Sequence, residues 1–163
     1  IKNKRNGLLK VLHQVDFLLI NDSEVRQLAG ESNLVAACRK IISLGPDILV
    51  EKQGEYGACM FYSDGRNKEK TEIFSAPSIP LDNVKDPTGA GDSFAGAFMG
   101  FLASKGGNIN EQNIRHAVAI GSVVASFTVE GFSLDRLRQV EQEDIAARFR
   151  QLRRIAHFEN LEL

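Results

Sequence analysis

Apolar residues form two kinds of pattern along the chain, and the two kinds alternate. Short unbroken apolar runs at 17–20 and 48–50 are typical of strands buried in a parallel sheet. Apolar residues at helical spacing predict helices over 8–15, 22–28, 34–44, 89–102, 111–127 and 143–155. Residues 58–62 and 70–74 have the pattern of two further strands, joined by the hairpin signal Asp64-Gly65. This order predicts an α/β layered fold with a mainly parallel central sheet flanked by helices, plus a β-hairpin.

The composition narrows the class of protein. The chain has 163 residues, the size of one domain, and it opens inside a helical pattern without a start methionine. We therefore expect it to be part of a longer protein. Its formal net charge of −1 argues against a domain built mainly to bind nucleic acid. Neither a membrane-spanning apolar run nor a signal-peptide pattern is present, which predicts a cytoplasmic protein without a membrane partner.

The cysteines and histidines predict neither a disulfide framework nor a zinc site. Cys38 and Cys59 each sit among apolar neighbours, as buried small hydrophobic residues do. His13, His116 and His157 lie far apart, without metal-ligand spacing.

The segment from Asp86 to Phe94, Asp-Pro-Thr-Gly-Ala-Gly-Asp-Ser-Phe, is the most informative for chemistry. Its glycines predict a turn, and an amphipathic helix follows directly. The amides of Gly89, Ala90 and Gly91 would point out of the helix start, where unpaired N–H groups and the helix dipole attract anions. A carboxylate at Asp92 could accept a proton from an attacking hydroxyl there. Such positioning and charge stabilisation suffice for phosphoryl transfer.

Two other interpretations of this segment stay open. Gly91-Asp92-Ser93-Phe94-Ala95 nearly matches the Gly-x-Ser-x-Gly nucleophile elbow of serine hydrolases, which would need Ser93 on a strained turn and a partner such as His116 or His157. Alternatively, Asp92 only complements the helix dipole, and the glycines only form the turn.

Residues Asp86 to Gly96 closely resemble the C-terminal signature of the ribokinase-like, or PfkB, carbohydrate kinases. Two weaker matches occur in the family's order. Asn21-Asp22-Ser23-Glu24 resembles its Asn-x-x-Glu motif, and 52–57 resembles the Thr-x-Gly-x-x-Gly turn that lines the nucleotide site. The turn at 128–131 is also in register. The resemblance covers nearly the whole chain and implies that 1–163 is the C-terminal ATP-binding and catalytic part of a single ribokinase-like domain.

The resemblance also implies roles for individual residues. Asp92 would be the catalytic base, and the amides of Gly89, Ala90 and Gly91 would form the anion hole. Asn21 and Glu24 would organise Mg²⁺ and its waters. Asp86 and the backbone of Thr88 match positions where some family members bind a monovalent cation such as K⁺. The nucleotide-binding residues would be Lys52, Gly54, Gly57, Ile120, Gly121 and Val124.

Three positions depart from the family or allow a simpler interpretation. Lys52 replaces the usual hydroxyl residue, and its ammonium group either reaches the phosphates or points to solvent. Ile120 stands where the family often has Asn or His, so a polar contact near the adenine would be missing. Asn21 and Glu24 could also be a plain helix cap with an exposed glutamate.

The implied activity is transfer of the γ-phosphoryl group of ATP to a hydroxyl of a sugar, a sugar derivative or a nucleoside. The alternative is a member of the same family that binds nucleotide without catalysis. The family's sugar-contacting residues and lid come mostly from an N-terminal half that is not in this sequence. Ribose, fructose or its phosphates, 2-keto-3-deoxygluconate and adenosine therefore all remain open as acceptors. A homodimer would form through the lid strands outside this chain.

Overall fold

The computed structural model describes residues 4–63, 68 and 70–160, and these form two compact units. The first unit consists of residues 1–54 and 58–75, and the second of residues 55–57 and 76–163. The sequence-based expectation that both belong to a single domain stays a prediction.

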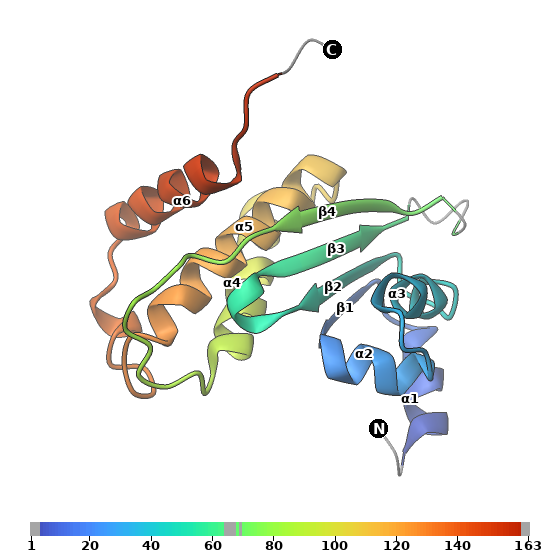
Figure 1. Cartoon of the computed structure of the whole chain (residues 1–163). Helices are drawn as coiled ribbons and strands as arrows, with labels where there is room; N and C mark the ends of the chain where they lie inside the picture. The colour runs from blue at the N-terminus through green and yellow to red at the C-terminus, as the bar shows by residue number, and fades with distance from the viewer. Residues whose placement is uncertain (1–3, 64–67, 69, 161–163) are drawn as a thin grey trace. The chain divides into compact units, whose positions relative to one another are not determined.

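In the described residues, the sheet has four strands in the order β1 (Phe17–Asn21), β2 (Ile48–Lys52), β3 (Ala58–Tyr62) and β4 (Glu72–Ala76) (Figure 1). β1 and β2 pair in parallel, whereas β2 and β3 pair antiparallel. The expected mainly parallel sheet is therefore corrected to a mixed one. Only residues 53–57 connect β2 to β3, and a parallel connection needs a crossover of a dozen or more residues.

The hairpin prediction is confirmed for its first strand and shifted for its second. β3 has the expected bounds, and β4 begins at Glu72 rather than at residue 70. The predicted turn at Asp64-Gly65 lies outside the described residues.

Three helices pack against one face of the sheet in the first unit. They are α1 (Arg5–Leu12), α2 (Asp22–Ala29) and α3 (Leu34–Ile42). Their shared core contains Leu12, Ile20, Val25, Leu28, Ala37, Cys38, Ile41, Leu49 and Phe61. Each fully buried Leu, Ile or Phe side chain contributes about 1.5–3 kcal/mol to stability. The apolar spacing seen in the sequence is thus the side of each helix that this core buries. The bounds predicted for the first helix, 8–15, are wrong by three residues, because α1 ends at Leu12.

The second unit consists mainly of α4 (Ala90–Ser104), α5 (Glu111–Thr128) and α6 (Gln142–Ala156) (Figure 1). The short 3₁₀ turn η2 (Leu137–Gln139) also belongs to this unit, whereas the 3₁₀ turn η1 (Gly54–Tyr56) begins with a residue of the first unit. α5 packs against both α4 and α6. Asn110 begins α5 by accepting the Asn113 amide at 2.9 Å. The predicted bounds of these helices agree with the structure to within one or two residues.

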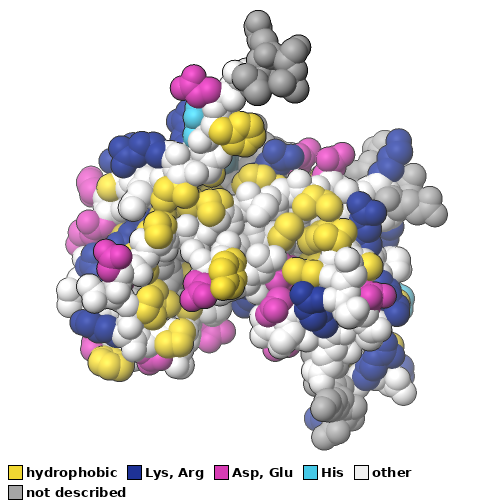
Figure 2. Space-filling model, viewed as in Figure 1, with side chains coloured by type: hydrophobic (Ala, Val, Ile, Leu, Met, Phe, Trp, Pro, Cys, Tyr) yellow, Lys and Arg dark blue, Asp and Glu magenta, His cyan; other side chains and the backbone are white. Residues whose placement is uncertain are grey.

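Charged groups of both signs are interspersed on the face drawn in Figure 2. This distribution accords with the formal net charge of −1. Among the described residues, no helix combines the length and the apolar character needed to cross a membrane.

Candidate active site

The segment from Asp86 to Gly89 folds into the turn that begins α4. A carboxylate oxygen of Asp86, Oδ1, accepts the Thr88 amide at 2.9 Å, which closes an Asx turn. Hydrogen bonding to Thr88 lowers the pKa of Asp86. Gly89 has a φ of 82° and serves as the N-cap of α4 without a side-chain bond. A side chain at position 89 would be strained in this conformation, so glycine permits the turn.

The start of α4 leaves backbone donors free. The Ser93 amide bonds the Gly89 carbonyl at 2.9 Å, and the Ala90 amide bonds the Pro87 carbonyl at 3.2 Å. In the described part of the chain, the amides of Gly89, Gly91 and Asp92 have no acceptor. Of the three amides predicted for the anion hole, the Ala90 amide is therefore the one already hydrogen-bonded within the turn. Asp92 lies exposed in the first turn of α4, beside these donors.

The residue that follows α5 is hydrogen-bonded to the start of this turn. The Val129 carbonyl accepts the Lys85 amide at 2.8 Å and the Asp86 amide at 3.4 Å. A Cβ added at Gly89 would lie 4.0 Å from the Thr128 methyl group. The chain leading into the anion-binding turn is thus anchored to the C-terminal turn of α5.

The packing of α4 on α5 explains why position 121, one of the predicted site residues, is a glycine. Gly121 is buried, and a Cβ there would lie 3.0 Å from the Phe94 ring. Glycine at 121 therefore lets Phe94 pack directly against α5. Ile120 and Val124, four positions apart on α5, are both half-buried. Their roles beside an adenine stay predictions.

In the first unit, Asn21 and Glu24 form a capping box at the start of α2. Asn21 Oδ1 accepts the Glu24 amide at 2.8 Å, and Glu24 Oε2 accepts the Asn21 amide at 3.1 Å. The simpler interpretation of these residues, a helix cap, is thus confirmed. It does not exclude the metal role, because Glu24 is exposed and its second oxygen has no partner among the described residues.

Lys52 lies beside Asn21 at the carboxyl end of the parallel strands. The two residues are register partners in the β1–β2 pair, so their side chains leave the same face of the sheet. Ligands of α/β proteins bind at this edge. Lys52 is half-buried, and its ammonium group has no hydrogen-bond or ion-pair partner among the described residues.

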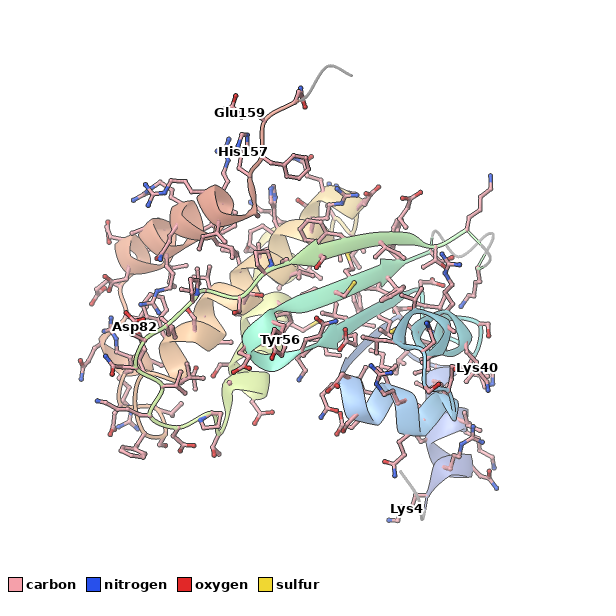
Figure 3. All side chains as sticks on the ribbon, viewed as in Figure 1. Lys4, Lys40, Tyr56, Asp82, His157 and Glu159 are labelled. Atoms are coloured by element: carbon pink, nitrogen blue, oxygen red, sulfur yellow. The ribbon has the colours of Figure 1, made fainter. Side chains whose placement is uncertain are left out.

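Gly54 and Gly57 have positive φ angles of 59° and 109°, as the predicted tight turn requires. Nothing lies within 4 Å of a Cβ built at Gly54, which belongs to the first unit. At Gly57, in the second unit, a Cβ would lie 2.2 Å from the Ala76 carbonyl oxygen. Close packing of its own backbone therefore requires glycine at 57. Tyr56, labelled in Figure 3, is 75% exposed on this turn.

The serine hydrolase interpretation lacks its required geometry. Ser93 is an ordinary helical residue, and among the described residues Ser133 alone has a positive φ without being glycine. His116 makes edge contacts with Phe101 and Phe149. His157 lies past the end of α6 (Figure 3). No strained nucleophile elbow forms at this serine.

Sequence reasoning missed one buried acid at the candidate edge. Glu51 of β2 is 0% exposed, and its Oε2 accepts a hydrogen bond from Gln53 Nε2 at 2.7 Å. Its other oxygen, Oε1, is buried and has no hydrogen-bond partner among the described residues. Burial raises the pKa of Glu51, as does the charge of Asp22. An acidic residue inside an apolar run was the available signal.

The described residues hold no group of three or more His, Cys, Asp or Glu side chains arranged for a metal ion.

Comparisons with known proteins place the chain in a family. Residues 1–137 match the model of the pfkB family carbohydrate kinases. A cytidine kinase from Thermococcus kodakarensis is 32% identical over 59% of this chain and 33% of that protein. A 2-dehydro-3-deoxygluconokinase from Thermoproteus tenax is 31% identical over 85% of this chain and 40% of that protein. The chain belongs to the pfkB family, and it spans less than half the length of these relatives.

A solved structure agrees with the family's fold. Aminoimidazole riboside kinase from Salmonella enterica, complexed with aminoimidazole riboside and an ATP analogue, matches with a TM-score of 0.75 and 19% identity. The match covers 91% of this chain and 47% of that chain. The fold is therefore α/β and ribokinase-like.

Proposed function

We propose that this chain supplies the ATP-binding and catalytic part of a kinase. The kinase transfers the γ-phosphoryl group of ATP to a hydroxyl of a sugar, a sugar derivative or a nucleoside. The observation that carries this proposal is the start of α4. There, the amides of Gly89, Gly91 and Asp92 find no acceptor among the residues that the structure describes, and the Asp92 carboxylate is exposed in the same turn.

The proposed reaction uses this turn in two ways. Asp92 accepts the proton of the acceptor hydroxyl, and the resulting oxygen attacks the γ-phosphorus of ATP. The bond between that phosphorus and the bridging oxygen breaks, and ADP leaves. The free amides and the positive end of the α4 dipole stabilise the charge on the transferring group. Phosphoryl transfer needs mainly this positioning and electrostatic stabilisation.

The first unit would hold the polyphosphate and its metal. Mg²⁺ would supply positive charge at the phosphate oxygens, bound through water to Glu24 and Asn21. Glu24 is exposed, and its second oxygen has no partner within the described part of the chain, which fits such an outer-sphere contact. Lys52 would contact the phosphates, and Gly54 would let the backbone approach them. Gly57, Ile120, Gly121 and Val124 would border the nucleotide.

A monovalent cation would bind beside the anion hole. Asp86 and the backbone of Thr88 would provide the oxygen ligands. Hydrogen bonding to Thr88 lowers the pKa of Asp86 and keeps this carboxylate ionised, and its Oδ1 also closes the Asx turn. This donor set suits a hard cation such as K⁺.

The decisive experiment measures ATP turnover by the full-length gene product. Acceptors would include ribose, fructose, 2-keto-3-deoxygluconate, cytidine and adenosine, with Mg²⁺ and with or without K⁺. Asp92→Asn is expected to lower kcat by about 10²–10⁴-fold with the accepted substrate. Ser93→Ala, the neighbouring residue, is the matched control and should leave turnover within about threefold.

The outcomes separate the alternatives. Equal turnover by Asp92→Asn and the unchanged protein would contradict the base assignment. ATP binding without turnover of any acceptor would favour a non-catalytic, nucleotide-binding member of the family. Loss of activity in Ser93→Ala, with Asp92→Asn active, would restore the hydrolase interpretation.

A further inference from the structure

A half-buried ion-pair cluster lies directly after α5. Glu130 Oε1 pairs with Arg148 Nη2 at 2.9 Å, and Glu130 Oε2 pairs with Arg136 Nε at 3.5 Å. The Glu130 side chain is 23% exposed and that of Arg148 is 16% exposed. These charges are thus better shielded from water and salt than ordinary surface pairs. Glu130 comes from the turn after α5, whereas Arg148 comes from α6.

Arg148 is fixed by two further contacts. Its Nη1 donates a hydrogen bond to the Ser126 hydroxyl at 3.1 Å. Its guanidinium carbon lies 3.6 Å from the centroid of the Phe127 ring, a cation–π contact. The Arg136 guanidinium lies over the same ring at 5.2 Å. The position of Glu130 is therefore specified from α6 and from the last turns of α5.

The residue before Glu130 leads directly to the candidate active site. The Val129 carbonyl accepts the amides of Lys85 and Asp86. Asp86 in turn accepts the Thr88 amide, and the turn continues into Gly89 at the start of α4. A continuous series of contacts therefore runs from Arg148, through Glu130 and Val129, to the anion-binding turn.

The cluster is not required merely to hold α6 against α5. An apolar core of Val123, Phe127 and Leu152, with Phe149 packed against it, already joins the two helices. Shielded ion pairs are weak evidence for stability, because desolvation offsets much of their attraction. The hydrogen bonds within such ion pairs are directional, so they fix orientation. In this cluster they orient the turn that carries the Val129 carbonyl.

We propose that Glu130 and Arg148 are positioning residues for the anion-binding turn at 86–92. They hold the Val129 carbonyl in the orientation that fixes the Lys85 and Asp86 amides, and thereby the free amides of Gly89 and Gly91 and the Asp92 carboxylate. The catalytic consequence rests on the proposed kinase function, whereas the structural consequence does not. Small displacements of a catalytic group can cost about 10²-fold in rate.

The experiment compares Glu130→Gln and Arg148→Met with Glu111→Gln and Arg115→Met. Glu111 and Arg115 form an ion pair at the opposite end of α5, which makes them a matched control. Hydrogen exchange of the full-length gene product would be followed by mass spectrometry in peptides covering 83–93. Peptides from the middle of α4 serve as the internal reference for global stability.

The expected result is local. Exchange of the Lys85 and Asp86 amides accelerates at least about tenfold in both cluster variants, more than in the α4 reference, and not in the control pair. With an accepted substrate, kcat falls about tenfold or more while KM for ATP changes less than about threefold. Arg148→Lys keeps the positive charge. Its amide exchange and its kcat should therefore lie closer to those of the unchanged protein than the values for Arg148→Met.

Two results would overturn the inference. One is exchange at 83–93 that rises only in step with the α4 reference, since that would reveal a global loss of stability. The other is unchanged exchange and unchanged kcat in both cluster variants. If the unchanged protein phosphorylates nothing and binds no ATP, the proposed function fails. The exchange measurement still decides the positioning role in that case.

Discussion

The ring of Phe94 on α4 packs directly against Gly121 on α5, and three of its carbons lie 3.0 Å from where a Cβ at 121 would stand. This contact sets the spacing of the two helices at the end of α4 that carries Asp92. Valine at 121 would overpack the contact. We expect Gly121→Val to destabilise the protein by about 1–3 kcal/mol, measured by urea denaturation.

Gly100 on α4 provides the control for this prediction. No atom of the described residues lies within 4 Å of a Cβ built at Gly100, and the residue is exposed within the helix. In the 163-residue chain, Gly100→Ala should raise stability by about 0.5–1 kcal/mol, because alanine loses less backbone entropy on folding. A Gly121→Val variant as stable as the unchanged chain would contradict the tight contact with Phe94.

The capping box at α2 allows the structural and metal-binding roles of its residues to be separated. Asn21→Ala removes the oxygen that accepts the Glu24 amide and should cost about 1 kcal/mol. Glu24→Gln keeps an acceptor for the Asn21 amide, so stability should change by less than about 0.5 kcal/mol. If Glu24 also organises Mg²⁺, this variant should need several times more Mg²⁺ for half-maximal turnover. An unchanged Mg²⁺ requirement would leave Glu24 with the capping role alone.

The buried carboxyl group of Glu51 should give the free energy of unfolding an unusual dependence on pH. Burial raises its pKa above the ordinary value of 4.5, so the folded state favours the protonated acid. Its stabilising contribution is present below about pH 4.5 and is lost as pH rises through the folded pKa. Glu51→Gln mimics the neutral acid and should be more stable than the unchanged protein at pH 7, by about 1 kcal/mol or more. Near pH 4 the two should have similar urea midpoints.

A matched variant makes that test specific. Glu72 is exposed on β4, and Glu72→Gln should shift stability by less than about 0.5 kcal/mol at either pH. A Glu51→Gln variant that is less stable than the unchanged protein at pH 7 would show that the ionised carboxylate is stabilised.

The two cysteines should be unreactive in the folded protein. Burial raises the pKa of Cys38 to about 12 and that of Cys59 to about 11, and the charge of Glu51 acts in the same direction. The thiolate is the reactive form, so at pH 8 alkylation should be slower than for a free cysteine by about two orders of magnitude or more. Iodoacetamide labelling followed by mass spectrometry measures this rate, with the urea-unfolded chain as reference. Rapid labelling of half-buried Cys59 would contradict the raised pKa.

Local features of the fold were predictable where neighbouring residues determine them. The Asn33 side chain caps α3 by accepting the Ala36 amide at 2.9 Å, and Gly30 ends α2 with a φ of 65°. Both depend on contacts within a few residues, so the sequence contains the information. The sheet was harder to predict. Strand direction depends on how the chain returns from β2 to β3, and apolar runs do not encode that direction.

The candidate site divides in the same way. The sequence by itself determined the turn from Asp86 to Asp92, the capping residues of α2 and membership of the family, because each is a contiguous run of residue types. Only the tertiary structure decided that Phe94 packs against Gly121 and that Glu130 pairs with Arg148. It also decided that Glu51 is buried with one carboxylate oxygen that has no partner among the described residues. These relationships join residues from different elements through packing, and a pattern along the chain does not specify which side chains such packing brings into contact.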